Sequence, residues 1–449
     1  MKIAVIGAGI SGLGAAWLLQ RAHDVTLYEA EDRLGGHAHT VDVDLPRRNG
    51  TAQRIAVDTG FIVYNERNYP HLTRLFQTLD VPTKASKMSF SVSLGGGSLE
   101  YAGSGRGLFT QPGNLLKSDY WSMIYDITRF YREAPQLLAA GPEAADITLG
   151  DYLSSEGYGD SFIYDHLLPM GAAIWSSTLS DMLAFPAVSF VRFFSNHGLL
   201  SYSERPAWRT VTNGSRNYVE RLIADFRGRV LSGRPVTAVR RSPAGVEVQD
   251  ANGHRERYDE VVLACHADQA LAMLGEDAST EEREVVGSFR YQRNRAVLHL
   301  DTTLMPRRSQ CWASWNYLAE RNRAADRRVA VTYWMNSLQP LKTSTPVLLT
   351  LNPLREPAEE TILSEFSYDH PQFDLQALRA QTRLGAIQGA RRIWFCGSYC
   401  GYGFHEDGLE AGFAVARALG APAPWDREVA SASPAADNAS PHDYAEAAE

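Results

Sequence analysis

The sequence predicts an α/β fold in which a Rossmann-like dinucleotide-binding domain is interleaved with a second, α+β domain. Three observations predict this fold. The hydrophobic strand at residues 2–6 runs into a glycine-rich turn and then into an apolar helical run, the order that a dinucleotide-binding βαβ unit requires. A second strand at residues 25–28 ends in Glu29. Residues 258–264 end in the apolar run Val261-Val262-Leu263-Ala264, which is typical of a buried parallel strand.

The glycine-rich turn has the pattern G-x-G-x-x-G, with Ser11 at its last variable position. Gly7 allows the tight turn, Gly9 lets the backbone approach a pyrophosphate, and Gly12 lets the following helix pack closely on the strand. The N-terminus of that helix then faces the phosphate charge. Glu29 lies where a carboxylate accepts hydrogen bonds from both hydroxyls of an adenosine ribose and would repel a 2'-phosphate. The unit therefore predicts FAD or NAD rather than NADP.

Composition excludes several classes of protein. The 449 residues are 44% hydrophobic and 21% charged, which is a globular composition long enough for two domains. A net charge of -8 gives no footprint for nucleic acid, and no stretch of 18 apolar residues predicts a membrane span. The four cysteines lack the spacing of a metal site, so we expect free buried thiols and no metal. Because the glycine fingerprint begins at the initiator methionine, we expect no cleaved export signal and a cytoplasmic protein.

A second motif begins at Glu29 and narrows the choice of dinucleotide cofactor. The run E-x-x-x-R-x-G-G-x-x-x-T contains Arg33, Gly35, Gly36 and Thr40, and it resembles the second flavin signature of the amine oxidase and phytoene desaturase superfamily. The resemblance implies bound FAD, an amine-oxidase-like fold of the two-dinucleotide-binding type, and a glycine pair against the FAD phosphates. We expect FAD to be held noncovalently, with His37, His39 and Cys400 as the conceivable points of covalent attachment. A second arginine usually follows the pair in that superfamily, and His37 stands there in this sequence. We expect Arg33 to carry more of the phosphate charge compensation.

Two further segments are candidates for the flavin by the same resemblance. The turn Asp58-Thr59-Gly60 ends a strand, and in similar flavoproteins such a turn brings backbone close to the isoalloxazine ring. An ordinary strand-ending turn is the alternative, and both can hold at once. The backbone at Val236 corresponds to a position that brackets the adenine in similar proteins.

The closing segment resembles the flavin-capping helix of the amine oxidases. A strand at residues 392–396 ends at Gly397 and Ser398, and the run G-F-H-E-D-G-L-E-A-G begins at residue 403 and continues into a helix. By that match, backbone N–H groups at Asp407, Gly408 and Leu409 face the flavin N1 and O2 edge. The helix dipole would stabilise an anionic reduced flavin.

These segments predict a discontinuous domain organisation. The FAD-binding domain is expected at residues 1–75, 208–275 and 385–424, the substrate domain at 76–207 and 276–384, and a disordered tail at 425–449. The substrate domain begins with a hairpin at residues 90–101 and continues into a helical block at residues 107–200 that is rich in aromatic residues. Such a block can be core or the wall of an apolar tunnel, and Trp175 beside small residues is a candidate wall residue.

The substrate and its access are inferred from these features. We expect a lipid or another apolar small molecule as partner. Residues 107–131 are a candidate amphipathic helix for peripheral contact with the inner membrane surface.

Only one dinucleotide fingerprint occurs, so electrons are expected to come from a substrate carbon, as hydride to flavin N5, rather than from NAD(P)H. Simple amine oxidation is disfavoured because no lysine occurs between Lys117 and Lys342, where amine oxidases usually have one. The cage tyrosine of the capping motif is matched by Phe404, and the following methionine by His405. The motifs in detail are similar to a bacterial branch of FAD-dependent oxidoreductases that resembles the flavin desaturase of furan fatty acid synthesis.

The leading hypothesis is an FAD-dependent desaturase of methyl-branched unsaturated acyl chains. The candidate bases are His405, Tyr64 and Tyr402, with a packing or helix-capping histidine as the alternative for His405. Three other functions stay open: an acyl double-bond isomerase, an amine oxidase, and a flavin-bearing partner of a lipid-modifying enzyme that itself catalyses nothing.

Overall fold

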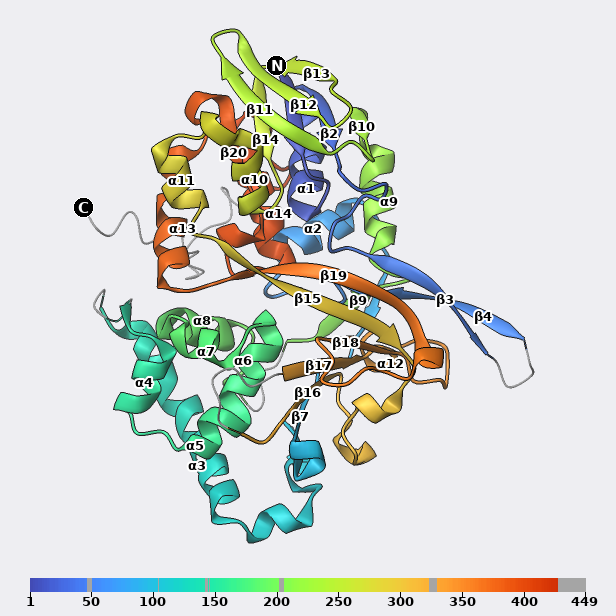
Figure 1. The fold of residues 1–449 in the computed structure, drawn as a ribbon, viewed down its shortest axis with the longest axis vertical. Coiled ribbons are helices and arrows are strands. Elements are labelled where there is room, and N and C mark those ends of the chain that lie inside the picture. The colour runs from blue at the N-terminus through green and yellow to red at the C-terminus, as the bar shows by residue number, and fades with distance from the viewer. Residues whose placement is uncertain are drawn as a thin grey trace.

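The computed structural model describes residues 1–426 apart from 47–50, 104, 142–143, 145, 202–205 and 323–328. Within these residues the chain forms two halves, drawn one above the other in Figure 1. The upper half contains the N-terminus and a parallel sheet, and the lower half contains a larger mixed sheet beside a group of helices. Among the described residues, no helix is both long enough and apolar enough to cross a bilayer.

The upper half is built on a parallel sheet in the order β10-β2-β1-β14-β20. Its strands are β1 (Lys2–Ile6), β2 (Asp24–Tyr28), β10 (Arg229–Leu231), β14 (Glu260–Leu263) and β20 (Ile393–Phe395). Alternation along β1 sends Ile3 and Val5 into one hydrophobic core and Ala4 and Ile6 into another. Both faces are therefore buried, which explains the unbroken apolar pattern of these strands.

Helices and a small sheet cover these two faces. The first core includes side chains of α1 (Ile10–Leu19), α2 (Pro70–Thr78), α9 (Arg216–Asp225) and α14 (His405–Ala418). The second includes side chains of α10 (Ala267–Leu274), α11 (Thr280–Val286), α13 (Leu375–Ile387), and of the antiparallel strands β11 (Val236–Ser242), β12 (Gly245–Asp250) and β13 (Arg255–Tyr258). This is the predicted Rossmann-like arrangement, with helices on both sides of a parallel sheet.

The lower half is built on a seven-stranded sheet in the order β19-β15-β18-β17-β16-β7-β8. Its strands are β7 (Phe90–Leu94), β8 (Leu99–Ala102), β15 (Arg290–His299), β16 (Trp315–Ala319), β17 (Val329–Trp334), β18 (Leu348–Leu351) and β19 (Ile362–Gln372). The long antiparallel pair β15 and β19 runs from the upper half into this sheet (Figure 1).

The helices of the aromatic block pack beside this sheet and share one core with it. They are α3 (Ser118–Glu133), α4 (Leu149–Ser155), α5 (Asp160–Phe162), α6 (Leu168–Trp175), α7 (Leu179–Ala184) and α8 (Ala187–Asn196), while α12 (Met335–Leu338) follows β17. Two short sheets join the halves. One is the hairpin of β3 (Thr40–Pro46) and β4 (Ala52–Asp58), and the other contains β5 (Tyr64–Asn65), β9 (Trp208–Val211) and β6 (Thr83–Ala85).

Three elements pack in a different half from the one that the predicted domain boundaries give them. The boundary at 385 falls inside α13, whose buried residues join the upper core, and the boundary at 276 precedes α11, which joins the same core. The hairpin β3–β4 was assigned to the upper half, yet its inward residues pack in the lower core. These elements were misplaced because the sequence shows an apolar face but not which distant core that face meets.

The predicted tail begins later than residue 425. Trp425 is buried and its ring stacks on Trp17 with 6.2 Å between ring centroids, and Asp426 Oδ2 accepts a hydrogen bond from Ala423 N. The rest of the predicted tail, residues 427–449, lies outside the described residues.

Candidate active site

A cavity of about 1170 Å³ is lined by residues of both halves. It is larger than an ordinary small-ligand pocket of roughly 300–1,000 Å³, as a cavity for a dinucleotide and a second molecule should be. Most of the predicted cofactor residues line it: Gly7, Gly9, Ser11, Glu29, Arg33, Gly36, His37, Thr59, Gly60, Val236 and Ser398. The predicted substrate residues Trp175 and Phe404 line it too, as do His405 and Tyr402.

The glycine turns leave room for a ligand at the start of α1. Gly9 is the N-cap of α1 and supplies no side-chain cap, and a Cβ added to Gly9 would meet no atom within 4 Å. A Cβ on Gly36, in contrast, would lie 3.0 Å from Gly9 Cα, so the glycine pair rests against this turn. The open N-terminus of α1 beside bare backbone fits a pyrophosphate, which is the group that FAD would place there.

Close packing of the fold requires glycine at positions 7 and 12. Gly7 has a φ of +104°, and a Cβ there would lie 2.6 Å from the carbonyl oxygen of Ala264. A Cβ on Gly12 would lie 1.9 Å from the carbonyl oxygen of Gly7. These two glycines therefore let α1, β1 and the end of β14 approach one another.

Two charged residues are held at the end of β2. The Glu29 carboxylate accepts hydrogen bonds from the backbone N–H groups of Ala8 at 2.7 Å and Glu31 at 3.0 Å. Arg33 donates from Nη1 to the carbonyl oxygen of Gly36 at 2.7 Å, and its Nη2 lies 3.0 Å from Glu31 Oε2. Arg33 thus lines the cavity, holds the backbone of the glycine pair by a hydrogen bond, and forms an ion pair with Glu31.

Three histidines gather where the superfamily's second arginine would be. The His37 ring lies 5.5 Å from the His370 ring and 6.3 Å from the His266 ring, measured between centroids, and all three line the cavity. Burial, reinforced by His370 and His266, holds the pKa of His37 well below its usual range. Its Nε2 is buried without a hydrogen-bond partner among the described residues. An unsatisfied nitrogen of this kind fits a polar ligand such as the FAD pyrophosphate.

His370 and His266 were not predicted from the sequence. His370 shares one face of β19 with Tyr368, since residues two apart in a strand point the same way, and both line the cavity. That alternation was visible, but the choice of face depends on the pairing of β19 with β15. No motif around His266 indicated a site. Among the described residues, no group of three His, Cys, Asp or Glu side chains could hold a metal ion.

Several predicted cofactor residues support the cavity without lining it. They are Gly12, Gly35, Thr40, Asp58, Gly397, Asp407, Gly408 and Leu409. Asp58 is the centre of one such support: Oδ1 accepts hydrogen bonds from Thr40 Oγ1 at 2.5 Å and from Ser215 N at 2.8 Å, and Oδ2 accepts one from Gln339 Nε2 at 2.6 Å. Burial raises the pKa of Asp58 to about 6. Both carboxylate oxygens of Asp58 are therefore engaged in hydrogen bonds to three separate segments. Of the predicted turn, only Thr59 and Gly60 line the cavity.

The N-terminus of α14 points its first residues at the cavity. Phe404 and His405 line the cavity, while Asp407 Oδ2 accepts a hydrogen bond from Phe404 N at 2.8 Å and caps the helix. Burial raises the pKa of Asp407 to about 6. A Cβ on Gly408 would lie 2.8 Å from Ser11 Oγ, so α14 packs tightly against the start of α1. This packing brings the opening and closing motifs of the chain to one site.

His405 is held as a neutral imidazole. Its ring stacks on Phe61 with 3.9 Å between centroids and 8° between planes, and its Nε2 lies 2.6 Å from the hydroxyl oxygen of Tyr218. Burial lowers the pKa of His405 to about 3. It is therefore a weak base at neutral pH.

The end of the cavity at Phe404 has aromatic walls. The ring of Phe193 stacks on Phe404 at 4.9 Å and lies 4.7 Å from the ring of Trp175, between centroids. Trp175 Nε1 donates to the carbonyl oxygen of Tyr402 at 3.2 Å, which ties α6 to the loop before α14. The predicted candidate base Tyr64 is in a different place: it is buried against Tyr69 and Phe76 and does not line the cavity. The prediction for Tyr64 is corrected because its ring belongs to the upper core.

The structure also places the four cysteines and His39 relative to the cavity. All four cysteines are free, as expected, and Cys265 alone among them lines the cavity. His39 Nδ1 lies 2.9 Å from the hydroxyl oxygen of Tyr368, outside the cavity lining.

Comparison with known proteins is consistent with this geometry. Residues 10–304 match the family described as flavin containing amine oxidoreductase. Two tryptophan 2-monooxygenases match over short stretches. That of Pantoea agglomerans pv. gypsophilae is 64% identical over 39 residues, which are 8% of this chain and 7% of that protein. That of Allorhizobium ampelinum is 61% identical over 41 residues, 9% of this chain and 6% of that protein.

Solved structures share the fold over nearly the whole chain. A CLA-producing fatty acid isomerase from P. acnes has a TM-score of 0.64 and 17% identity, over 92% of this chain and 98% of that one. A putrescine oxidase variant has a TM-score of 0.64 and 16% identity, over 93% and 98%. Cyclohexylamine oxidase from Brevibacterium oxydans has a TM-score of 0.62 and 16% identity, over 93% and 99%.

Proposed function

The chain belongs to the flavin containing amine oxidoreductase family and is an FAD-dependent oxidoreductase, and from this premise we propose that it oxidises an unsaturated acyl chain of a lipid. Within that proposal, the reaction is desaturation: hydride leaves an allylic carbon, a proton leaves its neighbour, and a new C=C bond forms. FAD supplies the hydride acceptor for this reaction. The observation that carries the proposal is the uncharged, aromatic character of the cavity beside Phe404.

The charge of the cavity lining supports an apolar substrate over an amine. The charged lining residues other than histidine are Glu29, Glu31, Arg33, Arg234 and Asp369. Four of these five follow strands of the dinucleotide-binding sheet, and the aromatic end contributes none. A cationic amine held there would lack a carboxylate partner, which is costly for a charge removed from water. An acyl chain has no such requirement.

The aromatic end would orient the chain and exclude water. Trp175, Phe193 and Phe404 contact one another and give rigid apolar walls. The hydrogen bond from Trp175 to the Tyr402 carbonyl fixes these walls relative to the start of α14. A C–H bond between these walls and His405 would lie at the junction of the two halves.

His405 is a sufficient proton acceptor for this chemistry even though its basicity is low. Loss of hydride from an allylic carbon leaves an allylic cation, and a C–H bond next to such a cation is a strong acid. A neutral imidazole with a pKa of about 3 can take that proton, whereas it could not deprotonate an unactivated carbon. Tyr402 also lines the cavity and is the second candidate.

An acyl double-bond isomerase is the second candidate function. One protein that shares the fold is described as a CLA-producing fatty acid isomerase. Such a reaction returns the hydride to a different carbon and transfers no proton, so a site with only weak bases suits it as well. The mass of the product separates the two reactions.

The test is the mass of lipid after a single turnover without oxygen. Purified holoprotein is mixed with phospholipid carrying methyl-branched monounsaturated chains, and with matched saturated chains as control. Desaturation predicts product lighter by two hydrogens from the unsaturated lipid alone. Unchanged mass with a moved double bond would support the isomerase, and reaction with putrescine or cyclohexylamine but no lipid would overturn the acyl proposal.

A further inference from the structure

Exposed apolar side chains are concentrated in one stretch of the lower half. Among the described residues, the exposed large hydrophobic side chains are Met1 and four others that all lie within residues 109–125. These four are Phe109, Leu116, Trp121 and Tyr125, exposed by 46%, 91%, 49% and 64%. The stretch comprises η2 (Gly105–Phe109), η3 (Pro112–Leu116) and α3, and it forms the lower end of the molecule in Figure 1.

Helix α3 has two apolar faces. Tyr120, Met123, Ile127 and Phe130 are buried in the lower core at helical spacing. Trp121 and Tyr125 lie four residues apart on the opposite face, in solvent. Trp121 Nε1 donates to the carbonyl oxygen of Leu115 at 2.9 Å, which holds the indole beside η3. Tryptophan and tyrosine with one apolar and one polar edge are typical of the interface between water and lipid.

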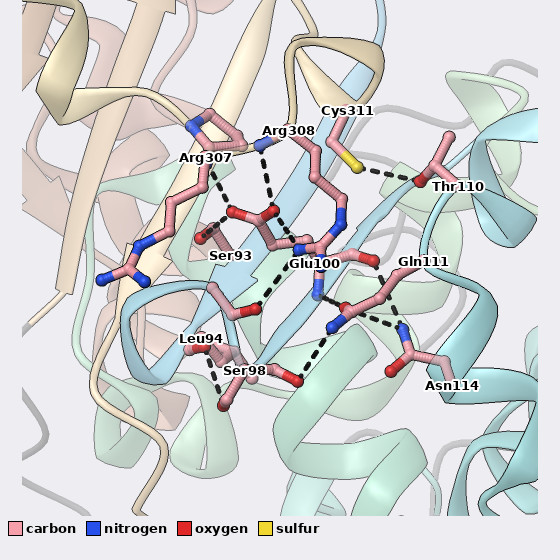
Figure 2. A network of polar contacts seen from close by, with 12 residues as sticks. Ser93, Leu94, Ser98, Glu100, Thr110, Gln111, Asn114, Arg307, Arg308 and Cys311 are labelled. Carbon is pink, nitrogen blue, oxygen red and sulfur yellow. Dashed lines mark hydrogen bonds and ion pairs between the residues drawn. The ribbon is translucent and has the colours of Figure 1, made fainter.

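A buried carboxylate anchors this stretch to the sheet. Glu100 is fully buried and accepts hydrogen bonds from the backbone N–H groups of Arg307 at 2.7 Å and Arg308 at 3.1 Å (Figure 2). Its own N–H donates to Gln111 Oε1 at 2.7 Å, and Gln111 Oε1 also accepts from Asn114 Nδ2 at 3.1 Å. This network ties residues 111–114 to β8 and to residues 307–308, so the segment that carries the apolar side chains is held to the sheet.

Cations outnumber carboxylates in the stretch that carries the exposed apolar residues. Residues 103–125 contain Arg106, Lys117 and one carboxylate, the exposed Asp119, although the whole chain has a net charge of -8. Arg307, joined to the stretch through Glu100, turns its guanidinium away from Glu100 in Figure 2 and toward the Gly96–Gly97 turn. Cations beside exposed apolar side chains complement anionic lipid headgroups above a hydrocarbon layer.

The cavity reaches the elements that carry these side chains. Tyr131 lies on α3, Gly103 lies two residues before the first residue of η2, and both line the cavity. The apolar interior and the apolar surface are therefore formed by neighbouring parts of one segment.

We propose that an apolar tip, defined as Phe109, Leu116, Trp121 and Tyr125 with the cations Arg106, Lys117 and Arg307, docks the protein on the surface of an anionic lipid bilayer. The apolar side chains enter the interface, and the cations lie at the headgroups. Docking is independent of turnover, so its test stands apart from the proposed reaction.

The experiment is sedimentation of holoprotein with vesicles of phosphatidylcholine alone or with one quarter phosphatidylglycerol. The wild type is expected to pellet with the anionic vesicles and to lose binding in high salt. The double variant Leu116→Ser with Trp121→Ser should partition at least about tenfold more weakly. Arg106→Gln with Lys117→Gln should bind anionic vesicles less, while the matched pair Arg255→Gln with Arg293→Gln, which removes exposed charges elsewhere, should bind as the wild type.

Brominated lipids give a second readout that needs no variant. Quenching of tryptophan fluorescence by lipids brominated in the upper acyl chain is expected, because Trp121 would enter the interface. Absence of both pelleting and quenching would overturn the proposal. A wild-type dimer that dissociates on Leu116→Ser with Trp121→Ser, without vesicle binding by either protein, would assign the apolar tip to self-association instead.

Discussion

At the scale of single residues, the candidate cofactor site depends on the absence of a side chain at Gly9. Its φ of -71° is open to any residue, and a Cβ would meet no protein atom. Gly9→Ala should therefore change the free energy of unfolding of the apoprotein by less than about 1 kcal/mol. It should weaken FAD binding by at least about tenfold, because the Cβ occupies the place where a pyrophosphate approaches the backbone. Fluorescence titration of apoprotein with FAD, together with thermal melting, measures both effects.

The matched control for Gly9 is Gly385→Ala, in the exposed face of α13, where a Cβ also meets nothing. It should leave FAD affinity unchanged and stabilise the helix by roughly 0.5–1 kcal/mol. Equal FAD affinity in Gly9→Ala and the wild type would refute the assignment of this turn to the pyrophosphate.

His405 gives a pH dependence whose sign follows from its burial. The unfolded chain has an ordinary histidine pKa near 6.5, while the folded protein lowers the pKa of His405 to about 3. As pH falls below 6.5, the unfolded chain binds a proton that the folded protein does not bind, so stability is lost between about pH 6.5 and pH 3. The contribution of His405 to this loss is about 2 kcal/mol between pH 7 and pH 5.

His405→Phe should remove that contribution, and urea unfolding at the two pH values measures it. Tyr218→Phe is the control, since it loses the same hydrogen bond but keeps the titrating imidazole. The interpretation fails if both variants lose as much stability as the wild type between the two pH values.

At the scale of elements, Asp58 is the joint between β3, the turn before α9, and α12. Asp58→Ala would leave the donors of Thr40, Ser215 and Gln339 unpaired in a buried place. Unfolding free energy should fall by about 3 kcal/mol, and FAD affinity should fall as Thr59 and Gly60 move. Thermal melting checks the first effect. The control Asp44→Ala, an exposed carboxylate on β3, should stay within about 0.5 kcal/mol of the wild type.

The elements also show which parts of the fold the sequence can predict. The strands β1 and β14 and the helix α14 were predicted because continuous apolar runs and glycine turns are local signals. The place of α13 was not, although Ala377, Ala380 and Leu384 recur at helical spacing. Their partners lie around β14 and β20, and a local pattern does not name a distant core.

In the candidate site too, residues within local motifs could be predicted from the sequence, and residues placed by distant contacts could not. Gly9, Gly36 and His405 were predicted because they lie within motifs that carry backbone geometry, and all three line the cavity. His370 and His266 were missed because their approach to His37 depends on the pairing of β19 with β15 and on the loop after β14. Tyr64 was misassigned because its packing against Tyr69 and Phe76 is a three-dimensional contact.

At the scale of the whole molecule, the two halves contribute different parts of the cavity lining. The upper half brings the opening and closing motifs together through the packing of α1 on α14. The lower half contributes aromatic walls from α6 and α8 and the long strand β19, and the cavity lies between these parts. The family and the fold establish an FAD-dependent oxidoreductase, and the uncharged end of the cavity supports the proposal of an acyl substrate.

The measurement that tests this account most directly is the anaerobic rate of flavin bleaching at about 450 nm with lipid carrying hydrogen or deuterium at the allylic carbon. Holoprotein mixed with methyl-branched monounsaturated phospholipid should bleach, and deuterium at the allylic carbon should slow the bleaching several-fold, because the proposed reaction breaks the C–H bond at that carbon. Bleaching by amines with none by any acyl lipid would contradict the account and assign the site to amine oxidation.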